Sequence, residues 1–345
     1  MKPIKKISLS YAVAFFVFLL FFPLFSYKAF KSAIKDEAFN HLITARELLK
    51  HQIIGYFRER FGDVDILAKN PIIKQALVQL SESFYTFGIN SSQYNKTLNR
   101  YQSLMEHYVK SHGYINIFLV NRDGDVIFSV TRENFTGTNV LTGKYQDFSF
   151  AQVFRNGLEE AAFEDYTWNN TRGEFRSYFS APVYDSQSLS GVLVIEIPFS
   201  HLDAMLTHRA GLGETGEMYL VGEDEFMRSN SRFSEEPTIL QQEVDTEAAQ
   251  DAFEGNTGTM ITADYRGVVV LSAYTPLNLK FVNWVLLAEI DEKEALRSIN
   301  TIERRLIIFT LVIFAVTTLY LYIIFKREKN NTTAESKHRI TGQGG

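Results

Sequence analysis

The sequence predicts an α+β protein in which a long N-terminal helix precedes two tandem antiparallel-sheet modules, with a transmembrane helix on each side. Three observations support this prediction. Each end of the 345-residue chain carries an uncharged apolar run, roughly 20 residues long, as a membrane-spanning helix requires. Between the runs, apolar residues first recur at helical spacing. They then form two successive series of short strand-like segments separated by turn residues.

The two apolar runs are residues 7–25 and 306–325. We expect the first transmembrane helix to continue two residues beyond its run, to residue 27. Lysines precede the first run, and lysine and arginine follow the second. The positive-inside rule therefore places both termini in the cytoplasm and residues 28–305 outside the membrane. The first run is long for a cleavable signal peptide, and no small-x-small site follows it, so we expect it to remain as an anchor.

Residues 28–69 are predicted to form one long helix, because apolar residues such as Leu42 and Leu49 recur along one stripe. Such a stripe fits either a stalk that pairs with its twin in a dimer or a helix that lies on its own domain. Asn70 and Pro71 then predict a break, since Asn caps helices and Pro suits the first helical position. The segments expected next are a helix at 72–80, a loop at 84–93 and a helix at 94–112.

Turn residues delimit the strands of both modules. The first series comprises strands at 115–121, 126–131, 162–168, 174–183 and 192–198, a helix at 148–157 and a turn at 169–173. The second series follows a helix at 199–208 and comprises strands at 217–221, 226–229, 257–265, 268–276 and 281–290, with a helix at 243–254. A last helix, 291–305, runs into the second apolar run.

The stretch 211–233 begins with three glycines, which predict a hinge between the modules. It also contains Gly-Glu-Asp-Glu-Phe at 222–226, one letter from the signature of diguanylate cyclases. That signature needs glycine at its second position, where the chain approaches the nucleotide, but Glu223 stands here. The expected topology also places the segment outside the membrane, away from GTP. We therefore interpret it as a polar turn with Glu223, Asp224 and Glu225 solvated.

Several short sequence motifs follow one another between the two apolar runs. They are residues 67–71 with 76–77, 118–124, 181–183 with 191–193, 211–233, 272–277 and 284–291. In this order, with a span on each side, the chain resembles the double Cache (PAS-like) sensor family over residues 30–300. Members of that family are the extracytoplasmic domains of bacterial chemoreceptors, histidine kinases and cyclases.

The resemblance implies a receptor in the bacterial inner membrane that binds a small ligand in the cup of a module, usually the distal one. A shift would then pass through the final helix into the second span. It also implies a homodimer through the stalk and transmembrane helices, and no cofactor. The expected parts are a cytoplasmic N-terminus (1–6), a span (7–27), a helical stalk (28–112), a distal module (113–208), a proximal module (209–300), a second span (306–325) and a disordered tail (326–345).

Strand alternation sends Arg176 and Tyr178 to one face, and an aromatic ring beside a guanidinium suits a carboxylate or polar organic ligand. Alternatively, Tyr178 packs in the core and Arg176 forms a surface ion pair. Amino-acid-binding members of the family carry an Arg-x-Trp-aromatic cluster in the distal module, and its absence here argues against an amino-acid ligand. The distal candidates are Arg132, Tyr145, Asp165, Tyr166, Trp168, Arg176, Tyr178 and Tyr184. The proximal candidates are Arg228, Arg232 and Tyr274, with a structural role for the arginines as the alternative.

Composition excludes several other functions. The chain has no cysteine, which rules out thiolate catalysis, disulfides and cysteine-ligated metals. Its 7 histidines make no i, i+4 pair, so we expect no metal site. A net charge of −5 gives no basic field for nucleic acid. No nucleophile elbow or phosphate loop occurs, so we expect no enzymatic activity in this chain.

The polar residues 326–345 are too few for a kinase, a cyclase or a signalling rod. We therefore expect the output to come from a cytoplasmic signalling partner, unless the chain is a truncated histidine kinase or chemoreceptor. A second hypothesis is a two-span accessory or scaffold protein whose outer domain binds another protein.

Overall fold

The computed structural model describes residues 3–169, 173–207 and 211–341. The chain forms two compact units, one of residues 41–291 and one of residues 1–40 with 292–345. Every strand in the described ranges belongs to the first unit, which therefore carries the candidate site.

Three helices, α1 (Pro3–Lys69), α2 (Pro71–Phe87) and α3 (Ser92–His112), precede the first sheet. The predicted break is confirmed: the Asn70 side chain accepts a hydrogen bond from the amide of Ile72 at 2.8 Å, and α2 begins at the proline. α2 runs past its predicted end because no glycine or proline interrupts the chain before Gly88, which has a φ of 79°. The loop predicted at 84–93 is therefore wrong in its first half.

The first sheet is antiparallel and five-stranded with one helical crossover, as predicted, and its order is β2-β1-β5-β4-β3. Its strands are β1 (Asn116–Asn121), β2 (Val126–Ser129), β3 (Ala162–Asn169), β4 (Glu174–Asp185) and β5 (Ser188–Pro198). A 3₁₀ helix, η1 (Gly143–Tyr145), and α4 (Ser149–Gly157) lie between β2 and β3, and α5 (Ser200–Leu206) follows β5. Residues 170–172 of the predicted turn, and His208 of the predicted helix, lie outside the described residues.

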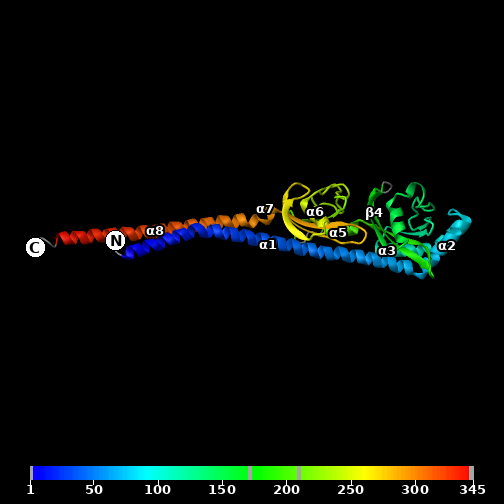
Figure 1. The fold of residues 1–345 in the computed structure, drawn as a ribbon, viewed down its shortest axis with the longest axis horizontal. Helices are drawn as coiled ribbons and strands as arrows, with labels where there is room; N and C mark the ends of the chain where they lie inside the picture. Colours follow the sequence, from blue (N-terminus) through cyan, green and yellow to red (C-terminus); the bar gives the residue numbers. More distant parts are fainter. Residues whose placement is uncertain (1–2, 170–172, 208–210, 342–345) are drawn as a thin grey trace. The chain divides into compact units, whose positions relative to one another are not determined.

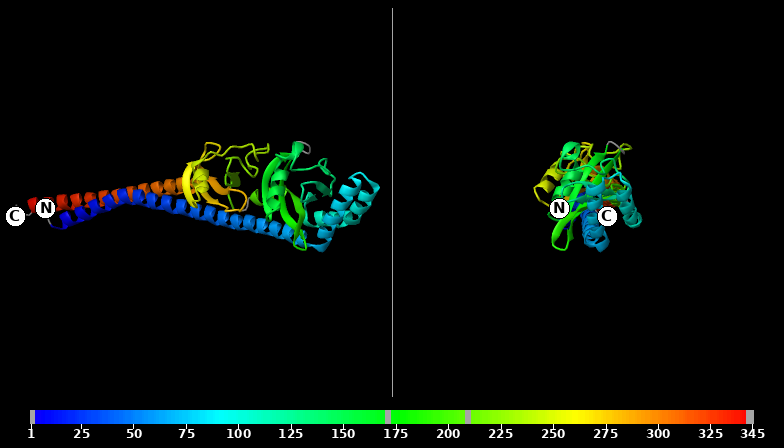
Figure 2. Two further views of the ribbon diagram at one scale, coloured as in Figure 1. Left: turned by 45° about the vertical axis from the view of Figure 1, so that its right-hand side comes forward. Right: turned by 90° about the vertical axis from the view of Figure 1, so that its right-hand side faces the viewer.

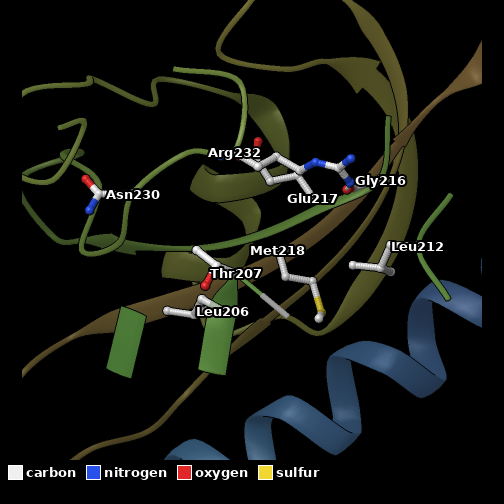
Figure 3. A pocket seen from close by; sticks show the side chains of 8 residues that line it. All are labelled: Leu206, Thr207, Leu212, Gly216, Glu217, Met218, Asn230 and Arg232. Carbon is white, nitrogen blue, oxygen red and sulfur yellow. Dashed lines mark hydrogen bonds between the residues drawn. The ribbon is translucent and has the colours of Figure 1, made fainter. Parts of the chain in front are cut away.

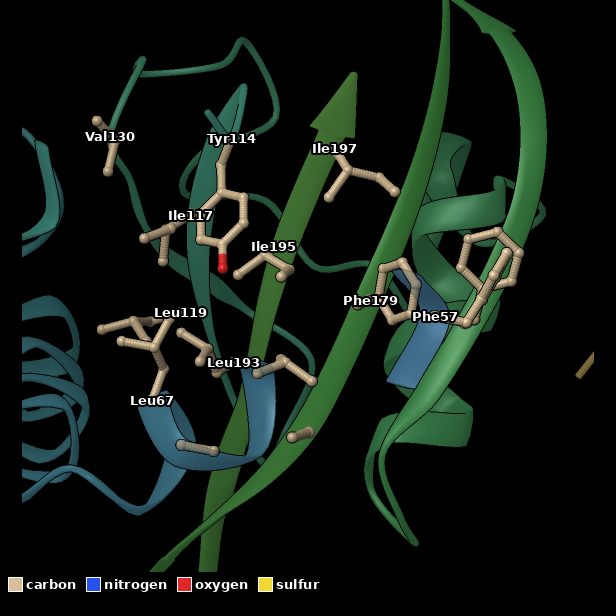
Figure 4. Packing of buried hydrophobic residues seen from close by; sticks show 14 of the residues in the cluster. Phe57, Leu67, Tyr114, Ile117, Leu119, Val130, Phe179, Leu193, Ile195 and Ile197 are labelled. Carbon is tan, nitrogen blue, oxygen red and sulfur yellow. The ribbon is translucent and has the colours of Figure 1, made fainter. Parts of the chain in front are cut away.

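Both faces of the first sheet are buried, because successive side chains of each strand point to opposite sides. On one face Ile117, Phe179 and Leu193 pack in a core with residues of α1, α2 and α3 (Figure 4). On the other face Phe118 and Val194 pack in a second core with residues of α4. The segment that links β2 to α4 can therefore form a cup on this second face.

The second sheet has four antiparallel strands in the order β6-β9-β8-β7. They are β6 (Glu217–Gly222), β7 (Gly258–Ala263), β8 (Val269–Pro276) and β9 (Trp284–Asp291), and α6 (Glu247–Phe253) precedes β7. The strand predicted at 226–229 is wrong, since its residues make only isolated bridges to Glu243 and Val221. Hydrogen bonds that join Asn230 and Ser231 to Thr238 turn the chain away before a ladder can extend.

One hydrophobic core joins both sheets to α1. The ring of Phe57 on α1 lies 4.9 Å from that of Phe163 on β3 and 5.7 Å from that of Trp284 on β9, measured between centroids. Leu220 and Leu286 of the second sheet belong to the same core. In Figures 1 and 2 the part of α1 that follows residue 41 runs beside both sheets. This part of the predicted long helix therefore lies on its own domain.

The unit of residues 1–40 and 292–345 contains α7 (Glu292–Ala295) and α8 (Arg297–Thr341). Among the described residues, the stretch Glu303–Ile324 is long and apolar enough to cross a membrane, with a mean hydropathy of 2.5. It overlaps the second predicted span. Residues 7–27 lie in α1, but most of their side chains are outside the description, so the first span stays a prediction. The tail predicted to be disordered is helical up to Thr341, which corrects that prediction.

Candidate functional site

A pocket of about 620 Å³ lies on the α4 face of the first sheet. Arg176 and Tyr178 of β4 both line it, as the alternation of the strand predicts. Thr167 and Trp168 of β3 form one side. Residues of the segment 133–148, which links β2 to α4, and Ser149 and Phe150 at the start of α4 form the rest of the wall.

Aromatic rings make up much of that wall. Phe150 packs against Phe135 with ring centroids 4.9 Å apart. Tyr145 continues the row, 5.6 Å from Phe135 and 5.4 Å from Phe148. Phe148 is 56% exposed and Trp168 is 50% exposed. Large aromatic side chains left half exposed around a pocket present faces on which a ligand can pack.

Carboxylates enclose Arg176. Its Nε lies 2.8 Å from Oε1 of Glu196 on β5, and its Nη2 lies 3.5 Å from Glu174 and 3.7 Å from Glu133. Burial opposes its charge, but Glu196 and the other neighbours raise the pKa of Arg176 above its usual value. The Arg176 side chain is only 1% exposed, so the surface ion pair considered from the sequence is wrong. The pair with Glu196 is buried instead.

The pocket brings together four of the distal candidates, Tyr145, Trp168, Arg176 and Tyr178. Two others lie elsewhere. Arg132 is exposed after the end of β2 with a φ of 52°, and Tyr184 is 40% exposed towards the far end of β4.

Asp165 and Tyr166 contact the second sheet instead of the pocket, because β3 is irregular at this point. The pairing of β3 with β4 shifts between Glu164 and Thr167, as at a β-bulge. Asp165 Oδ2 accepts a hydrogen bond from Trp284 Nε1 at 3.0 Å. The Tyr166 ring stacks on the Trp284 ring with centroids 5.7 Å apart. The bulge therefore joins the two sheets.

Arg228 completes this contact between the sheets. Its Nε lies 2.9 Å from Asp165 Oδ2 and its Nη1 lies 2.8 Å from Asp224 Oδ1, while its own side chain is 7% exposed. Burial raises the pKa of Asp165, and Arg228 opposes that rise. Asp224 is exposed, as predicted, and also forms an ion pair with Arg228 within the stretch 211–233.

Arg232 and Tyr274 also make structural contacts. Arg232 donates hydrogen bonds to the carbonyl oxygens of Glu214, at 2.7 Å, and Gly216, beside a cavity of about 10 Å³ (Figure 3). That volume suits one water molecule rather than an organic ligand. Tyr274 is 4% exposed in the core of the second sheet, and its hydrogen bond lowers the pKa of Asp251. The contacts of both arginines support the structural alternative.

Sequence reasoning missed most of the wall between β2 and α4. Of this segment it selected only Tyr145, although five of its other side chains also bear a charge or an aromatic ring at the pocket. These are Glu133, Phe135, Lys144, Asp147 and Phe148. The available signal was compositional, since the segment is irregular yet rich in aromatic residues. Glu196 was detectable as the single acidic residue in the apolar run of β5.

Comparisons with known structures show the same fold elsewhere. The ligand-binding domain of the Campylobacter jejuni chemoreceptor Tlp3, in complex with 4-methylisoleucine, is 12% identical and has a TM-score of 0.54, covering 76% of this chain and 94% of its own. The sensory domain of the same receptor is 12% identical and has a TM-score of 0.54. The match covers 77% of this chain and 98% of that domain. The ligand-binding domain of the Pseudomonas fluorescens chemoreceptor CtaA, in complex with L-leucine, is 12% identical and has a TM-score of 0.50. The match covers 76% of this chain and 99% of that domain. A comparison with curated proteins gave no match.

The family comparison is more specific. The model of the Cache domain family matches residues 26–299, which is most of the 345-residue chain. The two antiparallel sheets and the long helix before them fit two such modules in tandem. This chain therefore belongs to the Cache domain family, as a double Cache sensor domain.

Proposed function

We propose that the chain is a membrane-anchored sensor that binds a small organic ligand in its first module, residues 113–208, and acts by binding rather than catalysis. The observation that carries this proposal is the pocket of about 620 Å³ with half-exposed Trp168 and Phe148 at its wall. The Tlp3 and CtaA domains are in complex with 4-methylisoleucine and L-leucine, which supports a ligand of similar size.

The sensor is proposed to lie in a bacterial inner membrane with both termini in the cytoplasm. The apolar stretch Glu303–Ile324 and the basic residues that follow it support the second span. The run 7–27, preceded by lysines, is proposed as the first span. Residues 28–305, with a second module at 209–300, would then face the outside, and the signal would pass to a separate cytoplasmic protein.

A ligand that enters the pocket is expected to change the fluorescence of Trp168, one of 2 tryptophans in the chain. Trp168→Ala is expected to weaken binding about tenfold, because it removes a large aromatic contact surface. The measurement is a thermal-shift and fluorescence screen of the full chain in detergent against a broad metabolite panel. Tyr184→Ala is the matched control, since Tyr184 is 40% exposed outside the pocket. If no compound raises the melting temperature, the sensing proposal fails and a protein-binding scaffold becomes the better explanation.

We propose that β3 carries the signal from the pocket to the second module. Thr167 and Trp168 line the pocket, while Asp165, at the bulge, bonds to Arg228 and Trp284 of the second module. A ligand that moves one end of this short segment would displace the other. After β9 the chain continues directly into α7 and α8, so a shift of β9 has a covalent path towards the membrane.

Replacing Asp165 by Asn is expected to uncouple the modules while leaving the pocket intact. The experiment uses the Trp168→Phe variant, in which Trp284 is the remaining tryptophan and reports on the contact between the modules. Ligand should change the Trp284 emission, and Asp165→Asn should abolish that change while the dissociation constant stays within about twofold. Asp203→Asn is a control, because Asp203 also bonds to the second module, accepting hydrogen bonds from the backbone amide and the side chain of Asn230, but forms no hydrogen bond with Trp284 among the described residues. An unchanged Trp284 response in Asp165→Asn would show that the signal takes another route.

We also propose that two copies pair through the outer face of α1. Leu48 and Ile66 are 62% and 69% exposed on this helix. Gly55 and Gly62 between them have no atom within 4 Å of an added Cβ. Together with Gln52 and Glu59, these four residues are spaced alternately four and three residues apart along α1. This is the heptad spacing of the contact seam between two paired helices. The glycines would allow the two backbones to approach closely.

Ile66→Glu is expected to dissociate this dimer, because it replaces an apolar contact at one end of the seam by two like charges, one from each copy. Sedimentation velocity of the full chain in detergent measures the change, and about a tenfold weaker association is expected. Ile72→Glu is the matched control, since Ile72 is 44% exposed on α2. If wild type and both variants sediment as the same species, α1 is not the pairing surface.

A further inference from the structure

Two buried glutamates face each other across strands of the second sheet. Glu217 of β6 is 5% exposed and Glu289 of β9 is 3% exposed, and the two are directly opposite in the strand register. In the described part of the chain neither of them forms an ion pair. The arginine of the turn between β7 and β8, Arg266, pairs with Asp264 at 2.6 Å and with Asp291 at 2.8 Å. Two facing carboxyl groups without a cation in a core favour a proton on one of them.

The hydrogen bonds of the two glutamates show which one keeps that proton. Glu217 Oε1 accepts a hydrogen bond from the amide of Arg232, and its Oε2 accepts one from the hydroxyl of Tyr265, both at 2.7 Å. Glu289 Oε2 accepts one from Tyr219 at 2.8 Å, but its buried Oε1 has no hydrogen-bond partner among the described residues. Donors at both oxygens favour the charged form of Glu217. Burial raises the pKa of Glu289 from 4.5 to about 7, and Glu217 adds to the rise.

The other elements packed around Glu289 supply no compensating charge. β7 contains no titratable residue, and α6 turns three alanines to this core. β8 places the uncharged Ser272 opposite Glu289, and its Tyr274 bonds to Asp251 instead. From the turn between β7 and β8, Asp264 raises the pKa of Glu289 further. The site therefore binds a proton more readily than a solvated carboxyl group does.

A small cavity gives this pair access to water. Glu217 lines the cavity of about 10 Å³ together with Gly216 and Arg232 (Figure 3). That volume holds one water molecule. A water at this place can pass a proton to the carboxyl pair, so its titration does not require the chain to unfold.

The pair lies where a change in charge can move the end of a strand. β6 begins at Glu217, and β9 ends at Asp291, two residues after Glu289. The amide of Asp291 donates a hydrogen bond to Thr215 Oγ1 at 3.2 Å, just before β6. Like charges directly opposite each other destabilise a strand pair. Ionisation of Glu289 therefore weakens the contact between these two strand ends.

We propose that the second module is a proton sensor in which Glu217 and Glu289 together bind one proton. At acid pH the bound proton holds the start of β6 against the end of β9. At alkaline pH two negative charges push these strand ends apart, and β9 continues into α7 and α8. This function goes beyond ligand binding in the first module and needs no organic ligand. Only the step from β9 towards the membrane rests on the proposed sensor.

Infrared difference spectroscopy of the full chain in detergent tests the proton site. Near pH 6 ordinary carboxyl groups are ionised, so the carbonyl band of a protonated carboxyl group reports on groups with a raised pKa. Part of this band should be present in wild type near pH 6, disappear by pH 8 and be missing at both pH values in Glu289→Gln. Glu164→Gln is the matched control, since burial raises the pKa of Glu164 to about 7 as well. It should remove its own share of the band and leave that of Glu289.

A change on the facing strand tests whether the two carboxyl groups act together. Glu217→Gln should lower the pH midpoint of the Glu289 band by about one unit, because it removes the facing negative charge. The melting temperature at pH 5 checks that this variant and Glu289→Gln are folded. An unchanged midpoint in folded Glu217→Gln would show that Glu289 titrates alone and would overturn the proposed pair.

Spin labels test whether proton binding moves the strands. The chain has no cysteine, so labels attach only at introduced sites. Glu214→Cys with Val269→Cys places two exposed labels on either side of the β6–β9 pair, before β6 and on β8. Double electron–electron resonance should show this distance growing by about 1–2 Å from pH 5 to pH 8. Glu254→Cys with Val269→Cys is the control, because these sites do not span the β6–β9 pair.

The outcomes decide the inference without reference to the ligand. A band that depends on Glu289, with a pH-dependent label distance that Glu289→Gln abolishes, supports it. A band that Glu289→Gln leaves unchanged overturns it, because the pair then holds no proton near pH 6. A label distance that is the same at pH 5 and pH 8 also overturns it, because the proton then stabilises the fold without moving it. Neither result affects the metabolite screen, and a failed screen leaves this test standing.

Discussion

Truncating Phe57 to alanine is expected to lower the free energy of unfolding of the unit of residues 41–291 by about 3–5 kcal/mol. Phe57 is 3% exposed and belongs to α1. Its ring contacts Phe163 of β3, Phe179 of β4 and Trp284 of β9, with centroids 4.9, 5.8 and 5.7 Å apart. Removing it leaves a cavity where the helix and both sheets meet, and three large rings cannot collapse into that space together.

Urea unfolding of the full chain in detergent, followed by the combined fluorescence of Trp168 and Trp284, measures this effect. Phe87→Ala provides a control with the same change in volume, since Phe87 is 56% exposed at the end of α2. It should change the free energy of unfolding by less than about 0.5 kcal/mol. A loss below about 1 kcal/mol for Phe57→Ala would show that α1 contributes little to the joint core.

Helical periodicity predicts that α1 is a helix, but it does not predict which part of the molecule the helix packs against. The stripe of Leu42 and Leu49 predicts which face of the helix is apolar. It does not distinguish a second copy from the helix's own domain, because both are apolar partners. The structure buries this stripe against both sheets and leaves a different face, with Leu48 and Ile66, exposed. Packing on its own domain therefore uses one face of α1, and the proposed pairing with a second copy uses another.

The candidate site shows a similar limit. Alternation within β4 places Arg176 and Tyr178 correctly, because a regular strand has a period of two. It gives no guide to Asp165, because the register of β3 against β4 shifts between Glu164 and Thr167 and one added residue reverses the side-chain faces. The segment 133–148 has neither the period of a strand nor that of a helix, so its contribution to the pocket depended on tertiary structure.

Glu289 of the second sheet is expected to produce the largest pH effect on stability. It is 3% exposed on β9, directly opposite Glu217 of β6 and Ser272 of β8 in the strand register. Tyr219 donates a hydrogen bond to Glu289 Oε2 at 2.8 Å. Burial raises the pKa of Glu289 from 4.5 to about 7, with Asp264 and Glu217 adding to the rise and Ser272 and Tyr219 opposing it. Two carboxylates paired across strands in a core favour the proton on one of them.

The sign of the effect follows from which state binds the proton more tightly. Between pH 4.5 and about 7 the folded chain keeps the proton that the unfolded chain has already lost. The contribution of Glu289 to stability is therefore greatest below pH 4.5, falls as the pH rises to about 7, and stays level above it. The fall amounts to about 3 kcal/mol for this one group, from about 1.4 kcal/mol for each unit of pKa. Burial raises the pKa of Glu164 to about 7 as well, which adds a fall of the same sign.

Glu289→Gln is expected to remove the part of this fall that belongs to Glu289. Glutamine can still accept the hydrogen bond from Tyr219 and cannot ionise, so the variant should match wild type at pH 4.5 and exceed its stability at pH 8 by about 3 kcal/mol. Urea unfolding across pH 4.5–8 measures both curves, and Glu235→Gln on an exposed loop should leave the wild-type curve unchanged. Parallel curves for wild type and Glu289→Gln would mean that Glu289 is ionised in the folded state throughout.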